Sequence, residues 1–186
     1  MISIKPEKGH LLIAEPSIFG DTTFSRSVIL ITEHNESGTV GFVLNKVQDV
    51  KLKELVSDFQ KDWPLYAGGP VSPDQLNFIH TRPDLINDAV SIKNGLFWNG
   101  NYEDVVTAVN KGQITENEIR FFLGYSGWEQ QQFDEELKQN SWIVAENTFE
   151  SRLLKKADQE FWRMKMLELG GNYSLWANSP ENPNLN

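Results

Sequence analysis

Short apolar runs rich in β-branched residues are the feature that most limits how this chain can fold. Three of them lie in the first quarter of the sequence, at 11–14, 28–31 and 40–44, each bounded by turn-forming residues. Runs of this length are typical of buried strands. His34 to Gly38 separates the last two runs and has the composition of a hairpin connection. The sequence therefore predicts neighbouring antiparallel strands near its N-terminus.

The rest of the chain mixes further short strands with single helices. The strands are expected at 76–81, 89–92, 96–98, 118–123 and 142–145, with Asn94-Gly95 as a hairpin turn. Because strands and helices do not alternate regularly, the fold class that we expect is α+β with a largely antiparallel or mixed sheet. At 186 residues the chain suits one compact domain, alone or with a small α/β subdomain within about 72–145.

The helices are predicted from apolar spacing and from capping residues. One is expected over about 52–59, where apolar residues repeat at helical spacing. Asn101 is the expected N-cap of a second helix. A third, over about 159–169, is expected to end at Gly170. The segment 178–186, rich in proline and asparagine, is expected to form an extended tail.

The charge balance and the absence of cysteine restrict the classes of function. The formal net charge of −9 opposes binding to nucleic acid or to an anionic membrane. Without cysteine there are no disulfides, thiolate metal sites or cysteine nucleophiles. No signal peptide is evident, and the apolar runs are too short to cross a bilayer. We therefore expect a cytoplasmic protein without a cofactor or a metal ion, and without direct contact to nucleic acid or membrane.

The segment from Arg120 to Trp128 predicts a strand, a tight turn and a helix. Ser126 and Glu129 have the spacing of a capping box at the helix start. The segment also begins like the Gly-x-Ser-x-Gly elbow of hydrolases, but Trp128 stands where that elbow needs its second glycine, so a cap is the preferred role for Ser126. Arg120 and the helix N-terminus form a candidate anion site, unless Glu129 neutralises that helix end.

Three histidines are candidates for acid–base chemistry, and none has metal-ligand spacing. An enzyme would use His34 or His80 together with a carboxylate, either Glu33 or Asp21. A hydrogen-bonded structural role is the alternative for each histidine.

Arg26 and a pair of glycines are candidate ligand contacts. Arg26 precedes a buried strand, where it could clamp a carboxylate or phosphate, or pair with Asp21 or Glu33 and fix the sheet edge. Gly68 and Gly69 could bring backbone N–H groups close to a ligand, although a tight turn explains them equally.

Ordered motifs along almost the whole chain resemble those of the YqgE/AlgH family of bacterial proteins. They are Gly9-His10-Leu11-Leu12-Ile13-Ala14-Glu15-Pro16, Phe24-Ser25-Arg26-Ser27-Val28-Ile29, Gly38-Thr39-Val40-Gly41-Phe42-Val43-Leu44-Asn45, Gly68-Gly69-Pro70-Val71 and Arg120-Phe121-Phe122-Leu123-Gly124-Tyr125-Ser126-Gly127-Trp128. The chain departs from the family pattern at Gln131, where the family usually has glycine. The family also accepts alanine in place of Ser126, which weakens the nucleophile hypothesis further.

This resemblance implies a fold and leaves the activity open. The family fold is a bifurcated sheet curled into a pseudo-barrel, with helices packed around it. Some members are labelled transcriptional regulators, but this chain has no helix-turn-helix signature and its charge opposes DNA contact.

The leading hypothesis is a non-catalytic regulatory protein that binds a small anionic ligand or a protein partner. The alternatives are a small-molecule hydrolase or transferase that uses a histidine–carboxylate pair, and a transcriptional regulator that does not contact DNA directly. No catalytic residue is assigned. The candidate ligand or partner residues are Arg26, His34, Asn45, Gly68, Gly69, His80, Arg120, Tyr125 and Trp128.

Overall fold

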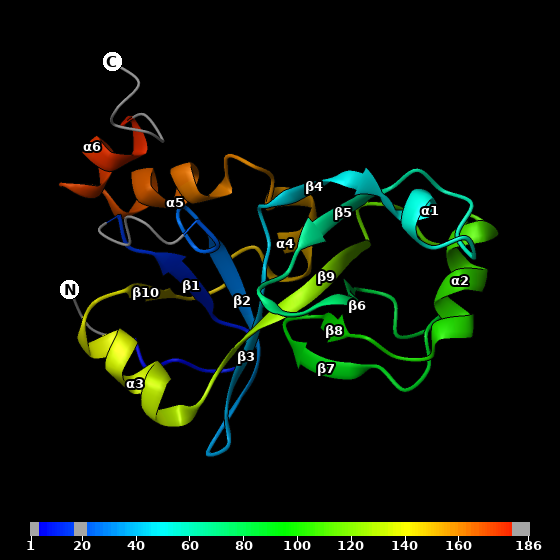
Figure 1. Cartoon of the computed structure of the whole chain (residues 1–186), viewed down its shortest axis with the longest axis horizontal. Coiled ribbons are helices and arrows are strands. Elements are labelled where there is room, and N and C mark those ends of the chain that lie inside the picture. Colours follow the sequence, from blue (N-terminus) through cyan, green and yellow to red (C-terminus); the bar gives the residue numbers. More distant parts are fainter. Residues whose placement is uncertain (1–3, 17–21, 180–186) are drawn as a thin grey trace.

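Strand β9, Ile119–Trp128, organises the sheet in the computed structural model, which describes residues 4–16 and 22–179 (Figure 1). The last part of β9 pairs antiparallel with β3, Gly38–Val43. Its first part lies between β5, Pro64–Ala67, which runs parallel to it, and β6, Val71–His80, which runs antiparallel. Because β3 and β5 follow one another along β9, the sheet divides there into two branches.

Each branch is extended by further antiparallel strands. The branch at β3 continues through β2 (Val28–Asn35), β1 (Leu11–Ala14) and β10 (Trp142–Ala145). The other branch continues from β5 to β4 (Val47–Lys51), and from β6 to β8 (Leu96–Trp98) and β7 (Val90–Lys93). The parallel β5–β9 pair makes the sheet mixed, and the sheet curls without closing into a barrel. The expected α+β class with a largely antiparallel, bifurcated sheet is confirmed.

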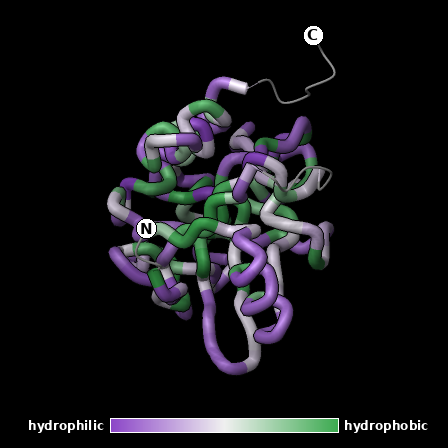
Figure 2. The backbone as a smooth tube through the Cα atoms, turned by 90° about the vertical axis from the view of Figure 1, so that its left-hand side faces the viewer, coloured by the Kyte–Doolittle hydropathy of each residue, from purple (hydrophilic) through white to green (hydrophobic). Residues whose placement is uncertain are grey.

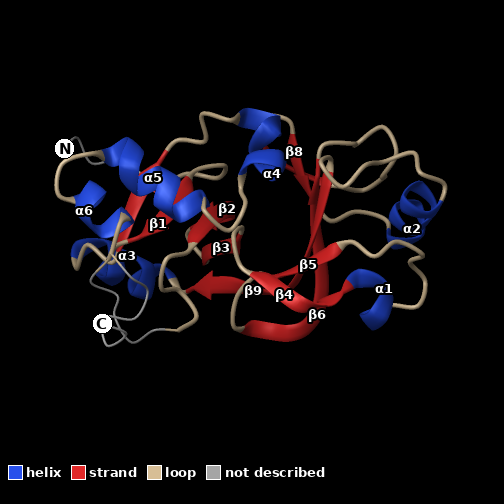
Figure 3. Cartoon of the chain, turned by 90° about the horizontal axis from the view of Figure 1, so that it is seen from above, coloured by secondary structure: helices blue, strands red, loops and turns tan. Residues whose placement is uncertain are grey.

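Helices cover the two ends of the sheet, as Figure 3 shows. At one end lie α3 (Gln130–Lys138), α5 (Phe161–Leu169) and α6 (Tyr173–Ala177). At the other lie α1 (Leu52–Leu55) and α2 (Tyr102–Asn110). A 3₁₀ turn (Glu150–Arg152) and α4 (Leu153–Lys156) lead into α5. In the part of the chain that the structure describes, no helix has the length and apolar character needed to span a membrane.

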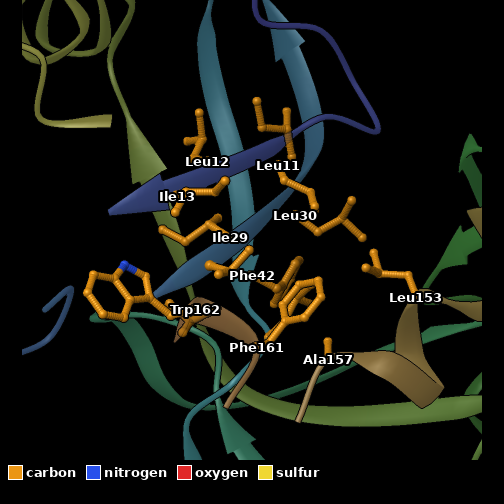
Figure 4. Packing of buried hydrophobic residues seen from close by; sticks show 14 of the residues in the cluster. Leu11, Leu12, Ile13, Ile29, Leu30, Phe42, Leu153, Ala157, Phe161 and Trp162 are labelled. Carbon is orange, nitrogen blue, oxygen red and sulfur yellow. The ribbon is translucent and has the colours of Figure 1, made fainter. Parts of the chain in front are cut away.

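The buried apolar residues form two clusters, and the larger one includes residues of strands from both branches, among them Leu30 of β2 and Ile79 of β6. In the larger cluster, Phe161 and Trp162 of α5 pack against Ile29 and Leu30 of β2, as Figure 4 shows. The second cluster gathers residues of α1, α2 and the first half of β9, among them Phe121. Figure 2 shows the hydrophobic segments inside the molecule and hydrophilic segments around them. β9 contributes to both clusters, so it joins the two halves of the molecule.

Several sequence predictions are confirmed in detail. The strands at 11–14 and 142–145 have the predicted bounds, and Asn94-Gly95 connects β7 to β8. The Asn101 side chain accepts a hydrogen bond from the Asp104 backbone N–H at the start of α2. Helix α5 ends before Gly170, whose φ of 68° lies in the left-handed region that glycine adopts readily.

Other predictions are wrong or untested. The helix expected over 52–59 ends at Leu55, although Phe59 is buried. Strands β4 and β5 were not predicted. The part of the expected tail from 180 to 186 lies outside the described residues. The subdomain suggested within 72–145 stays a prediction.

Candidate ligand-binding site

Ser126 lies inside strand β9, so the predicted turn at this position is wrong. The strand continues to Trp128, and Ser126 is completely buried. Its hydroxyl donates a hydrogen bond to the backbone oxygen of Gly68 at 3.0 Å. Glu129 is the N-cap of α3 and makes no side-chain cap hydrogen bond. The predicted capping box is therefore absent, and Ser126 instead links β9 to the loop between β5 and β6.

Gly68 and Gly69 permit that loop to touch β9 at backbone distance. A Cβ atom added to Gly69 would lie 2.3 Å from the carbonyl carbon of Tyr125, and one added to Gly68 would lie 2.4 Å from the oxygen of Gly124. Gly69 also has a φ of 153°. The two glycines are thus required by packing, because no side chain fits between the loop and the strand.

Trp128 and Trp142 anchor α3 to the sheet. Its indole N–H donates to Glu136 Oε2 at 2.9 Å, and the indole N–H of Trp142 donates to the same oxygen at 2.7 Å. The Trp128 ring also stacks on Phe24 and contacts Phe133. Only 5% of Trp128 is exposed, and both its indole N–H and its ring have partners within the protein.

Tyr125 lines an acidic groove, and His34 hydrogen-bonds to a residue of that groove without lining it. The groove measures about 550 Å³ and is lined by Tyr125, Glu33 and Glu129, among others. His34 Nδ1 is 2.8 Å from the hydroxyl of Thr39, which also lines the groove. The two glutamates make this groove unsuitable for an anion.

His80 is completely buried, and both ring nitrogens have backbone partners. Nε2 is 3.0 Å from the carbonyl oxygen of Asn99, and Nδ1 accepts a hydrogen bond from the Arg82 N–H at 3.1 Å. This pattern assigns the neutral tautomer with the proton on Nε2. Burial lowers the pKa of His80, while the nearby charge of Asp84 acts in the opposite direction.

The histidine–carboxylate pairs expected of an enzyme do not form among the described residues. Neither His34 nor His80 hydrogen-bonds to a carboxylate there, and the Glu33 carboxylate accepts from Asn35 instead. Asp21, the other proposed carboxylate, lies outside the described residues. In the described ranges there is also no group of three His, Asp or Glu side chains that could hold a metal ion.

Arg120 is buried near the start of β9, far along the strand from α3. Its guanidinium donates to the backbone oxygens of Leu44, Leu154 and Ala157. It also lies over the ring of Tyr66, 4.1 Å from the ring centroid. Burial lowers the pKa of the Arg120 guanidinium. The prediction that Arg120 assists the N-terminus of α3 is wrong, because the two lie at opposite ends of β9.

Arg26 and Asn45 are the two predicted residues that share a large surface depression. This basic depression, of about 940 Å³, is lined by residues from four segments, 22–26, 45–47, 159–163 and 177–179. It brings together three cationic side chains from separate segments, Arg26, Lys46 and Arg163. Among the described residues, Glu160 is the carboxylate that lines it. In a chain with a net charge of −9, this local excess of positive charge is distinctive.

Asn45 fixes the backbone that carries Arg26. The Asn45 side chain accepts from the Val28 N–H and donates to the Arg26 carbonyl oxygen, both at 2.9 Å. Asn45 is 6% exposed, and Arg26 has a φ of 53°, which is costly for a residue with a side chain. The Arg26 guanidinium then lies over the Trp162 ring, 5.1 Å from its centroid. Asn45 is thus a positioning residue, and Arg26 is the side chain that it positions.

The cations of the basic depression hydrogen-bond mainly to backbone oxygens. Arg26 donates to the oxygen of Ser179 at 2.7 Å, and Arg163 donates to the oxygen of Ala177 at 3.1 Å. Lys46 donates to the oxygen of Thr22 at 2.9 Å. Neither arginine forms an ion pair with a carboxylate of the described chain. The charges of these two arginines are therefore available to an anion from solution, while some of their donors hold the end of α6.

Sequence reasoning missed Lys46 and Arg163. Lys46 directly follows Asn45, the last residue of a recognised motif, whereas Arg163 lies in the helix expected over about 159–169. Only the fold places 22–26, 45–47 and the start of α5 around one depression. The other candidates are dispersed: His80 and Arg120 are buried at separate places, and Tyr125 borders the acidic groove.

The bifurcated sheet defines the class, and comparisons with known proteins define the family. The family model described as AlgH-like matches residues 11–174. A UPF0301 protein of Chlorobaculum parvum is 41% identical over 179 residues, which cover 96% of this chain and 95% of that protein. A UPF0301 protein of Bacteroides thetaiotaomicron is 36% identical over 99% of this chain and 93% of its own length. The chain belongs to the AlgH-like family, which confirms the resemblance seen in its motifs.

Solved structures agree with this fold. The solution structure of the AlgH protein from Pseudomonas aeruginosa matches with a TM-score of 0.71 and 28% identity, covering 97% of this chain and 98% of that one. The crystal structure of the protein DIP2367 from Corynebacterium diphtheriae has a TM-score of 0.75 at 23% identity, covering 96% of this chain and 95% of that one. The second likeness concerns the fold alone.

Proposed function

We propose that this is a cytoplasmic, non-catalytic regulatory protein that binds a small anionic ligand in the basic depression. The observation that carries the proposal is the convergence of Arg26, Lys46 and Arg163 on one depression of an acidic protein. Arginine is suited to carboxylate and phosphate groups, because its planar fork can donate two parallel hydrogen bonds. The Trp162 ring under Arg26 holds the guanidinium in place.

The size and polarity of the depression favour a polyanion of metabolite size. A volume of about 940 Å³ lies at the upper end of the range of small-molecule sites. The ligand would contact residues of the segment 22–26 and residues at the end of α6, which lie beside each other in the depression. Such a ligand would stabilise the end of α6, which Arg26 and Arg163 already hold.

Binding to defined anions tests the proposal. The full chain would be screened by thermal shift and then by calorimetry against inorganic phosphate, succinate and citrate, with glycerol as the neutral control. We expect saturable binding of at least one anion that weakens with added salt. Arg26→Gln and Arg163→Gln should each weaken it by about tenfold, the loss of one charge-assisted contact. Arg152→Gln is the matched control, because Arg152 is exposed and does not line the depression.

Two results would overturn this assignment. One is a lack of saturable binding by every anion of the panel. The other is equal loss of affinity in Arg152→Gln and in Arg26→Gln, which would mean that only the net charge matters. Regulation of transcription is compatible with the proposal if the protein acts through a partner, since a net charge of −9 opposes direct contact with DNA. Duplex binding at physiological salt would contradict that part.

A further inference from the structure

A small cavity beside Arg120 has the features of a second binding site. It measures about 190 Å³, and it is separate from the basic depression. Two of the buried residues that line it are Tyr66 and Arg120, and the exposed charged residues Glu116, Lys155 and Asp158 form its rim. The inference drawn from this cavity does not depend on the function proposed above.

Arg120 has two N–H donors left over. Nη1 donates to Leu44 and Ala157, and Nη2 donates to Leu154. A guanidinium has five N–H groups, so the Nε–H and one Nη2–H have no hydrogen-bond partner in the described chain. Nε and Nη2 form one edge of the guanidinium, and such an edge binds a carboxylate through two parallel hydrogen bonds.

One atom of this edge, Nε, keeps some accessible surface even though Arg120 as a whole is only 9% exposed. The completely buried side-chain polar atoms without a partner in the described chain are His10 Nδ1 and Trp98 Nε1. Arg120 Nε is not among them, so it keeps accessible surface, and the cavity that Arg120 lines is the space beside it.

The buried charge of Arg120 lacks an ion pair with any described carboxylate. Burying an unpaired ion is costly, and three carbonyl oxygens and the Tyr66 ring compensate that cost only in part. A carboxylate in the cavity would supply the missing negative charge at the Nε/Nη2 edge.

The rim argues against a ligand that is only an anion. Glu116 and Asp158 contribute two negative charges and Lys155 one positive charge, so the net rim charge is −1. The two carboxylates are close enough to raise the pKa of Arg120 against the effect of burial. They would repel a simple anion at the entrance and attract an ammonium group.

We propose that this cavity binds a small α-amino acid. Its carboxylate pairs with the Nε/Nη2 edge of Arg120, and its ammonium group lies toward Glu116 and Asp158. The cavity volume of about 190 Å³ equals roughly six water molecules in the liquid, which suits glycine, alanine or serine and excludes large side chains. The ligand class follows from opposite charges at the two ends of one small cavity.

Titration of the isotope-labelled full chain with L-alanine tests this inference. Acetate and ethylamine serve as probes of the two halves of the ligand. We expect alanine to shift the Nε–H resonance of Arg120 saturably, with an affinity about fivefold or more above that of acetate, the contribution of one partly exposed ion pair. Ethylamine should leave that resonance unchanged.

Variants of the buried Arg120 and of the rim carboxylates test the carboxylate contact and the ammonium contact separately. Glu116→Gln combined with Asp158→Asn should lower the affinity for alanine about fivefold, and it should leave the affinity for acetate unchanged or raise it. Arg120→Lys keeps the charge but loses the edge, so a folded variant should lose alanine binding. If that variant does not fold, the double variant of the exposed rim residues Glu116 and Asp158 still tests the proposal. Arg26→Gln should leave alanine binding intact, which separates this site from the basic depression.

Three outcomes would overturn the inference. Alanine without a saturable effect at about 10 mM would exclude a site of useful affinity. Equal binding of acetate and alanine, or an unchanged alanine affinity in the rim variant, would exclude the ammonium contact. Loss of alanine binding in Arg26→Gln would move the ligand to the basic depression.

Discussion

The buried His80 should make the stability of the protein fall in mildly acidic solution. Its two ring nitrogens are occupied by the Asn99 oxygen and the Arg82 N–H, and its side chain has no access to solvent. Protonation would place a second N–H against the Arg82 N–H and bury an unpaired charge. Burial accordingly lowers the pKa of His80 below its ordinary value of 6.5.

The direction of the effect follows from which state takes up the proton first. As the pH falls through 6.5, the unfolded chain protonates while folded His80 stays neutral, so the unfolded state gains stability. The contribution is complete above pH 6.5 and is lost progressively below it. Between about pH 7.5 and pH 5.5, one such group lowers the free energy of unfolding by at most about 1.4 kcal/mol.

Urea unfolding followed by tryptophan fluorescence at several pH values measures this loss. Wild type and His34→Gln should both lose stability toward pH 5.5. His80→Gln should be less stable at neutral pH, because glutamine cannot reproduce both backbone contacts, but its stability should depend less on pH. A His80→Gln variant with the same loss between these pH values as wild type would refute the reasoning.

Three further variants test the packing around β9 by the same unfolding assay. Ser126→Ala should cost only about 1 kcal/mol, because the Gly68 oxygen still accepts from the Val43 N–H, and a loss above about 3 kcal/mol would contradict this. Gly69→Ala should cost about 3 kcal/mol or more because its Cβ meets the Tyr125 backbone, whereas Gly112→Ala, with open space around it, should cost about 1 kcal/mol. Glu136→Ala should cost about 3 kcal/mol, because two indole N–H groups lose a charged acceptor. An unchanged midpoint of urea unfolding would show that these two hydrogen bonds contribute little.

Local signals in the sequence were enough to predict much of the fold. β-Branched runs predicted β1 and β10 at their observed bounds, and Asn101 predicted the start of α2. Each of these elements is determined by residues within a few positions of it. β4 was missed because it is an edge strand of mixed polarity, with one strand partner in the described sheet.

The segment at Gly124 and Ser126 shows why local reasoning fails where packing is tight. Small residues there predicted a turn, but they occur because the loop at Gly68 and Gly69 crosses β9 at backbone distance. The signal was in the composition of both segments, and only their contact in the fold distinguishes close packing from a turn.

The candidate site depended even more on tertiary structure. Arg26 and Asn45 were predicted as separate motif residues, and their direct hydrogen bond joins them. Lys46 and Arg163 had no motif of their own. Arg120 was a candidate for an anion site at the start of the helix after Trp128, but a cation between apolar residues on a central strand is buried by the fold.

The position of β9 in the chain has a consequence for folding during synthesis. β1, β2 and β3 leave the ribosome before β9 and β10. The outer edge of β3 pairs with β9 and that of β1 pairs with β10, and both of these partners lie beyond residue 118. Contacts of such long sequence separation form late. The three-stranded unit β1–β2–β3 therefore leaves the ribosome with both of its outer edges unpaired, and such edges are open to edge-to-edge association until β9 and β10 have been synthesised.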